Sequence, residues 1–343
     1  MNADRFSAIT GQYPRLRIAV VGDFCLDRYL EIDPTRTETS IETGLPVYNV
    51  VRVRAQPGGA GTIVNNLVAL GIGRIFPIGF SGEDGEGYEL RRALASLPGI
   101  ALDHFITTAL RRTFVYGKPL VIEPDGPPRE LNRLDSKNWT PTPRELQDDL
   151  AERVRALAPL VDAVIVLDQV DVPETGVATR RVVAAVHGLL RERPTLVTLA
   201  DCRRGLADYP PLGFKMNVAE LGRLSGAEPV DRHIVERLTA ELATRNAQPV
   251  FVTLAERGIV GALPNRPAEH VAAHRVRGPI DIVGAGDAVT ANLASALAAG
   301  AELVEAMELA MTAASVVIHQ LGTTGTATVA QSAALQFSEP PTN

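Results

Sequence analysis

A regular alternation of short apolar runs and longer amphipathic segments constrains this fold more than any other feature of the sequence. The runs are five or six residues long and rich in Val, Ile and Leu, as in strands covered on both faces; they lie at 16–21, 74–79, 101–106, 163–167, 196–200 and 250–254. Between them come segments with helical spacing, at 60–70, 85–97, 143–157, 174–191, 231–244, 288–299 and 302–319. This order predicts an α/β fold with an open, mostly parallel sheet and helices on both faces.

Length, charge and hydropathy exclude several classes of protein. The 343 residues suit one large domain or two ordinary ones, and we expect one domain over 1–330 and a C-terminal tail over 331–343. With 34 Lys and Arg against 40 Asp and Glu, and no basic run longer than a pair, nucleic-acid binding is not expected. No apolar stretch approaches the roughly 18 residues of a membrane helix, and the N-terminal one is too short for a signal peptide. The two cysteines, Cys25 and Cys202, make no disulfide framework. We therefore expect a cytoplasmic protein without membrane association.

Two segments interrupt the alternation, at 29–56 and 111–135. They lack helical spacing and carry short alternating patterns, for example over 46–51. Such patterns predict extra strands that pair with each other outside the main sheet. A small β lid over the strand ends is one interpretation, and an ordinary edge insertion is the other.

A small-residue turn directly before an apolar helix is the strongest local signal of chemistry. Gly284, Ala285 and Gly286 let the backbone turn tightly and present bare amides, where a helix N-terminus adds about half a positive charge. Such a cradle suits the charge that develops on a phosphoryl group in transfer. Asp287 follows at the helix start, where its carboxylate could accept a proton from an attacking hydroxyl. The alternative is a glycine-rich turn in which Asp287 merely caps the helix.

A second group of residues suits a polyol ligand. Gly58 and Gly59 precede a predicted helix, and bare glycine backbone lets a ligand approach closely. Asn66 in that helix could bond sugar hydroxyls. Asp23 and Asp27 follow the first predicted strand, at the strand end where open α/β sheets bind ligands. The alternatives are a helix-entry loop and solvated loop acids.

Asn217 and Glu220 form a third group just past a predicted strand. They stand one helical turn apart, so both polar groups could face the hydration shell of one Mg²⁺ ion. Asn217 could equally be a plain helix cap. Other signatures are absent: there is no GxxxxGK[ST] motif, and the pair His270 and His274 has no evident third zinc ligand.

In this order the motifs resemble the ribokinase-like (PfkB-type) carbohydrate kinase family over roughly residues 16–330. Within the family, the sequence is most similar to the heptose-7-phosphate kinase half of the ADP-heptose synthesis enzyme. The residues that carry this similarity are Val21–Tyr29, Pro57–Ala60, Asn132–Asp135 and Leu321–Thr324. The nucleotidyltransferase half of that enzyme is absent from this sequence.

The resemblance implies a three-layer ribokinase-like fold with a small β lid, ATP as phosphoryl donor, Mg²⁺ as cofactor and a homodimer formed through the lid. It implies Asp287 as general base, with an anion hole at Gly284, Ala285 and Gly286. Residues implied to bind the sugar are Asp23, Asp27, Gly58, Gly59 and Asn66. Residues implied near the nucleotide and its metal are Asn217, Glu220, Arg257 and Gly258, with Asp281 beside a K⁺ site.

Four departures from the family pattern bear on the substrate. Ile282 replaces a small residue of the late motif, Thr62 replaces an Asn after the glycine pair, and Met311 replaces an Asn on the adenine side. The segment 168–171 lacks the lysine of heptose kinases. The leading prediction is an ATP-dependent sugar or sugar-phosphate kinase. A non-catalytic sugar- or nucleotide-binding protein and a nucleoside kinase on the same fold remain alternatives.

Overall fold

The computed structural model describes residues 1–123, 126–227, 231–322 and 324–337. Within these ranges the main sheet has the strand order β14-β13-β12-β11-β10-β9-β1-β4-β5. Pairing is parallel from β5 to β12 and antiparallel from β12 to β14. The strands are β1 Arg17–Gly22, β4 Arg74–Gly82, β5 Phe105–Thr108, β9 Ala163–Asp168, β10 Val197–Cys202, β11 Phe214–Asn217, β12 Val250–Thr253, β13 Ile259–Ala262 and β14 Glu269–Val271. The predicted mostly parallel sheet is confirmed.

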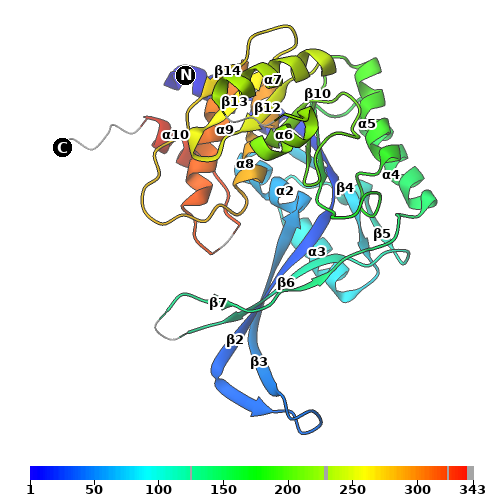
Figure 1. Ribbon diagram of the computed structural model, residues 1–343. Helices are drawn as coiled ribbons and strands as arrows, with labels where there is room; N and C mark the ends of the chain where they lie inside the picture. Colours follow the sequence, from blue (N-terminus) through cyan, green and yellow to red (C-terminus); the bar gives the residue numbers. More distant parts are fainter. Residues whose placement is uncertain (124–125, 228–230, 323, 338–343) are drawn as a thin grey trace, which may run out of the picture.

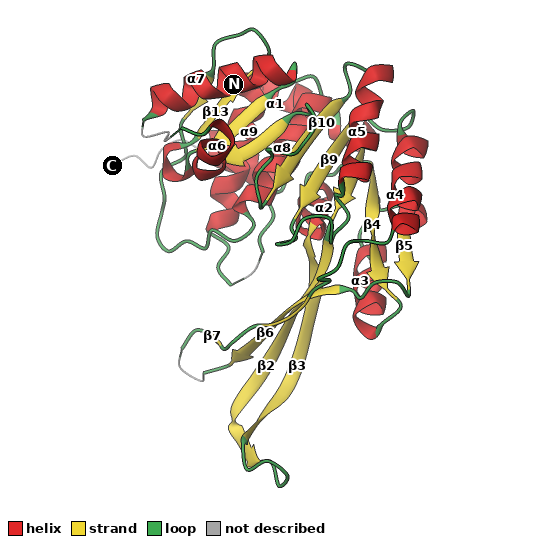
Figure 2. Cartoon of the chain, turned by 45° about the vertical axis from the view of Figure 1, so that its right-hand side comes forward, coloured by secondary structure: helices red, strands yellow, loops and turns green. Residues whose placement is uncertain are grey.

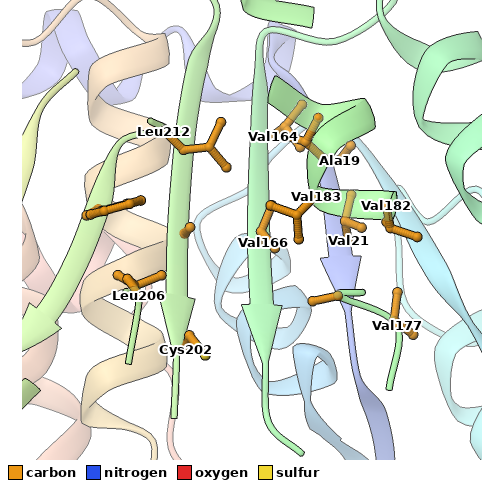
Figure 3. Close-up of a cluster of buried hydrophobic side chains, with 14 of the residues drawn as sticks. Ala19, Val21, Val164, Val166, Val177, Val182, Val183, Cys202, Leu206 and Leu212 are labelled. Carbon is orange, nitrogen blue, oxygen red and sulfur yellow. The ribbon is translucent and has the colours of Figure 1, made fainter. Parts of the chain in front are cut away.

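Helices cover both faces of this sheet, which gives three layers (Figure 1). Along β9, Val164 and Val166 join one buried cluster while Ala163, Ile165 and Leu167 join another, because successive strand side chains point to opposite faces. The first cluster, part of which Figure 3 shows, packs against α4 Arg144–Leu157, α5 Arg180–Glu192, α6 Val218–Ser225 and α7 Arg232–Asn246. The second packs against α1 Ala3–Thr10, α2 Ala60–Ala69, α3 Gly85–Ala95, α8 Ala285–Ala298 and α9 Leu303–Ile318.

The structure corrects the expected end of the domain. Residues 331–337, predicted to belong to a tail, lie in helix α10 Val329–Phe337. Its last residue packs against α1, where the rings of Phe6 and Phe337 meet edge to face at 5.3 Å. Residues 338–343 of the predicted tail, and Thr323 of the 321–324 motif, lie outside the described residues. Helix α1 was not predicted, and β5 begins later than expected, because residues 102–104 form a 3₁₀ turn.

A second sheet projects from the body of the molecule as a long twisted ribbon (Figure 2). Its strands are β2 Phe24–Thr39, β3 Pro46–Gly59, β6 Phe114–Val121, β7 Arg129–Glu130 and β8 Leu134–Ser136. β2 pairs antiparallel with β3 and parallel with β6, and β7 and β8 each pair with β6. Strand β2 follows β1 after a single residue, so the base of the ribbon lies at the carboxyl edge of the main sheet. None of the described helices is both long and apolar enough to cross a membrane.

Candidate active site

Polar residues cluster where the parallel strands of the main sheet end. Asp168 ends β9, Asn217 ends β11, and Asp201 is the penultimate residue of β10. The hydroxyl oxygen of Thr290, in the second turn of α8, lies 3.3 Å from Asp201 Oδ2, so the start of α8 lies at this edge. This is where open α/β sheets bind their ligands.

The turn that leads into α8 is built on a left-handed glycine. Gly284 has φ +84°, and a Cβ atom there would lie 2.7 Å from Thr324 Cγ2. Asp281 Oδ1 accepts the Val283 amide at 3.0 Å, and the Asp281 amide donates to the Ile318 carbonyl at 2.8 Å. The turn is therefore tied to the end of α9 and leaves no room for a side chain at 284.

Three amides at the start of α8 are free within the described part of the chain, but one of them belongs to a different residue from those predicted to form an anion hole. The Ala285 amide donates to the Ile282 carbonyl at 3.2 Å, so it closes the turn and is not bare as expected. The amides of Gly284, Gly286 and Asp287 have no acceptor among the residues described. The first amides of a helix lack intrahelical acceptors, so this cradle follows from backbone geometry and favours an anion.

The carboxylate of Asp287 is partly exposed in the first turn of α8. Desolvation, together with the nearby carboxylates of Asp201 and Asp27, raises its pKa to about 7 against the opposing effect of Lys215. A carboxyl group with a pKa near neutrality can take up and release a proton under ordinary conditions, as a general base must.

Lys215, Asp201 and Thr290 are site residues that the sequence analysis missed. Lys215 Nζ pairs with Asp201 Oδ2 at 2.7 Å and lies 3.1 Å from where a Cβ on Gly286 would be. Burial alone would lower the pKa of Lys215, but Asp201 and other carboxylates raise it, so the ammonium group stays charged beside the amide cradle. In the sequence, Lys215 lies inside a four-residue strand and resembles an interior strand position. Asp201 could have been found from the sequence, because it is an acidic residue directly after the predicted strand 196–200.

Asn217 and Glu220 form a reciprocal capping box at the start of α6. Asn217 Oδ1 accepts the Glu220 amide at 2.9 Å, and Glu220 Oε2 accepts the Asn217 amide at 2.8 Å. Of the two interpretations of Asn217, the helix cap is therefore the one seen in the structure. Burial raises the pKa of Glu220, and its Oε1 has no hydrogen-bond partner among the residues described. One carboxylate oxygen therefore remains available to a hydrated cation. Within the described ranges, no group of three or more His, Cys, Asp or Glu residues could hold a metal ion.

A cleft of about 520 Å³ adjoins the cradle. The predicted residues that line it come from three segments of the chain and are Asn217, Arg257, Gly258, Ala285 and Gly286. Two of the departures from the family pattern, Ile282 and Met311, line the same cleft. Ile282 is 73% exposed and Met311 is 6% exposed, so both give the cleft apolar walls.

Near Asp287, the base of the second sheet carries a buried carboxylate. Asp27 is 6% exposed and lies 3.7 Å from Lys118 Nζ. Burial raises the pKa of Asp27, while Lys118 lowers it. A Cβ on Gly58 would lie 2.8 Å from the Asp27 carboxyl carbon, so only glycine allows this approach. Gly59 ends β3 and is the N-cap residue of α2.

Two predicted sugar ligands have other partners. Asp23 is 2% exposed, and its carboxylate accepts the amides of Gln169 at 2.8 Å and Val177 at 2.7 Å. It anchors the loop after β9 and also lines a small cavity with Tyr116 and Lys137, so its expected role as a polyol ligand stays a prediction. Asn66 is fully buried in α2, and its amide group donates to the Thr62 carbonyl at 2.9 Å. The structure therefore does not bring Asn66 to the cleft.

Comparisons with curated proteins show relatives along nearly the whole chain. The bifunctional protein HldE of Gluconacetobacter diazotrophicus is 30% identical over 95% of this chain and 63% of the relative. HldE of Azotobacter vinelandii is 30% identical over 91% of this chain and 62% of the relative. The chain thus spans somewhat under two thirds of the length of these relatives.

Solved structures share the fold at low identity. A ribokinase of Arabidopsis thaliana, complexed with ribose and ATP, superposes with a TM-score of 0.68 at 19% identity, over 94% of this chain and 99% of the other. Phosphofructokinase-2 from Escherichia coli, in complex with fructose-6-phosphate, gives 0.66 at 17% identity, over 93% and 98%. The ribokinase-like fold is therefore confirmed. Residues 16–329 match the pfkB family of carbohydrate kinases, and the chain belongs to that family.

Proposed function

We propose that the protein transfers the γ-phosphoryl group of ATP to a hydroxyl group of a sugar or sugar phosphate, with Asp287 as general base. The observation that carries this proposal is the position of Asp287. It follows the amide cradle beside the large cleft, and the buried carboxylate of Asp27 is close enough to raise its pKa.

The chemistry follows from these positions. Asp27 accepts hydrogen bonds from the acceptor and orients the reacting hydroxyl towards Asp287. As the hydroxyl oxygen bonds to the γ-phosphorus, its proton passes to the Asp287 carboxylate, and the bond to the bridging oxygen breaks with its electron pair going to ADP. The amides of Gly286 and Asp287, together with the ammonium group of Lys215, stabilise the charge on the transferred group.

Glu220 Oε1 is the oxygen best placed to bind the hydration shell of the nucleotide's Mg²⁺, with Asn217 fixing the Glu220 side chain through the capping box. When bound, the ion would neutralise phosphate charge. We propose Asp281 as a ligand of K⁺. Its Oδ1 atom already accepts the Val283 amide in the turn before Gly284, which leaves Oδ2 for the ion.

The acceptor is expected to carry a phosphate. Lys118 lies on β6, and Arg133 and Lys137 flank β8, where both lie over the Tyr116 ring at 4.7 and 5.7 Å. In this structure Arg133 pairs with Asp135 at 3.0 Å and Lys137 with Asp171 at 2.7 Å. Strand β8 places Asp135 opposite Tyr116, which in turn pairs with Asp27. Charged donors of this kind recognise phosphate oxygens. A heptose 7-phosphate is the sugar phosphate that the resemblance suggests.

We predict that a panel of sugars and their phosphates, incubated with MgATP, will show ADP release only with a phosphorylated acceptor. Arg133→Gln should lower kcat/KM for that acceptor about tenfold, because a charged hydrogen bond is lost. Arg129→Gln, on β7 of the same sheet, is the control and should leave the rate unchanged. Turnover with free sugars or nucleosides alone would refute the phosphate assignment, and saturable binding without any transfer would refute catalysis.

We also propose a homodimer through the second sheet. Strand β3 is an edge of that sheet in the described chain, and the ribbon exposes large apolar side chains at Ile41, Leu45, Tyr48, Val50, Val51 and Val53. An open edge with exposed apolar residues favours pairing with another chain. Light scattering should give twice the chain mass of 36.6 kDa, and the double change Val51→Glu and Val53→Glu should give a monomer. Leu160→Glu, at an exposed site of the body, should remain dimeric; a monomeric wild type at micromolar concentration would contradict the proposal.

A further inference from the structure

The large cleft contains a histidine that neither the fold nor the proposed phosphoryl transfer uses. His274 follows β14 and lines the cleft with apolar residues such as Val276, Ile280 and Met311. Its Nε2 atom lies 3.0 Å from the Thr312 hydroxyl oxygen on α9. Among these apolar residues, the imidazole ring of His274 is thus held in place by a polar partner on α9.

The hydrogen bonds around His274 determine which nitrogen carries the proton. The Thr312 hydroxyl donates to the Glu308 carbonyl at 2.8 Å, as threonine in a helix often does with the residue four positions earlier. Its proton is thereby committed, so the hydroxyl oxygen accepts from His274 Nε2–H. Burial lowers the pKa of His274, and Arg277 adds to the effect, so the ring is neutral at physiological pH. A neutral imidazole with its proton on Nε2 has a lone pair on Nδ1.

The Nδ1 atom has no hydrogen-bond partner within the described part of the chain. An apolar cleft wall with an acceptor held in a fixed position suits a purine that offers a donor at that point. We propose that His274 is a specificity-determining residue that accepts a hydrogen bond from the exocyclic amine of adenine. The cleft then prefers adenine to a purine with a carbonyl group at the same carbon, and Thr312 is the positioning residue that fixes the tautomer. This proposal rests on the proposed use of a nucleotide by the same site.

The test compares ATP with ITP, which carries a carbonyl group where ATP has the amine. We expect the wild type to favour ATP, and His274→Ala to reduce the ratio of the two kcat/KM values about tenfold, because one hydrogen bond to the base is lost. The change should appear in KM for ATP, with kcat at saturating ATP retained. Thr312→Val keeps the shape but frees the ring, so the ratio should fall in the same direction by a smaller factor. His233→Ala, at an exposed site on α7, should leave the ratio unchanged.

Calorimetric binding of ADP and IDP to the same proteins separates this inference from the proposed function. If no nucleotide supports transfer but His274→Ala still reduces the ADP/IDP preference, phosphoryl transfer is refuted and the inference stands. If transfer occurs and both ratios are unchanged in His274→Ala, the inference alone is overturned. If the wild type binds neither nucleotide, both are overturned.

Discussion

Replacing Asp287 with asparagine is expected to lower kcat for phosphoryl transfer by about 10²- to 10⁴-fold, with little change in KM for ATP. Asparagine keeps the size and the helix position of the side chain but cannot accept the proton of the acceptor hydroxyl. Steady-state assays of ADP release with saturating acceptor measure the effect. A variant that retains activity within about tenfold of the wild type would show that another group is the base.

The pH dependence provides an independent check on the same residue. Burial raises the pKa of Asp287 to about 7, and the base acts only when ionised. Lowering the pH through that value protonates the carboxylate, so kcat/KM should fall about tenfold per pH unit below it and level off above it. The Asp287→Asn variant should lose this limb. A wild-type profile that stays flat between about pH 6 and pH 8 would contradict the assignment.

Gly284→Ala is expected to abolish most activity, with kcat/KM reduced by about 10²-fold or more. The backbone at this position is left-handed, with φ +84°, and the new Cβ would lie 2.7 Å from Thr324 Cγ2. The turn must shift, and it carries the free amides and Asp287 with it. Displacement of catalytic groups by about 1 Å can cost 10²-fold in rate.

Gly300→Ala is a matched control for that change. Gly300 has φ +81°, nearly the same as Gly284, but nothing lies within 4 Å of a Cβ built there. Both variants should lose about 1–2 kcal/mol of stability from the left-handed backbone, seen as a lower Tm. Only Gly284→Ala should lose activity. Equal losses of activity in both would show that global destabilisation, and not the turn, is responsible.

The layered architecture was predictable because it depends on local patterns. Alternate residues of a strand such as 163–167 must be covered on both faces, so a continuous apolar run already implies helices above and below the sheet. The helix at 329–337 was not predictable in this way. It is short and weakly patterned, and contacts such as Phe337 with Phe6 join the two ends of the chain.

Some residues of the candidate site were predictable from local sequence, and others were not. Local sequence placed Asp287 and its glycine turn, because small residues before an apolar helix produce a cradle wherever the helix goes. It could not separate Asp23 from Asp27, since both are acids near the same strand end. Only the loop at 169–177, far along the chain, decides that Asp23 is already occupied by two amides.

What the sequence by itself determined is therefore the alternation of strands and helices in the main sheet and the chemistry of the turn at 284–287. Tertiary structure alone decided which distant groups surround that turn. Lys215 and Asp201 come to Asp287 on separate strands, and His274 is held by a threonine 38 residues away. The physical reason is that backbone conformation depends on near neighbours in sequence, whereas the pKa of a base and the hydrogen bonds of a pocket depend on neighbours in space.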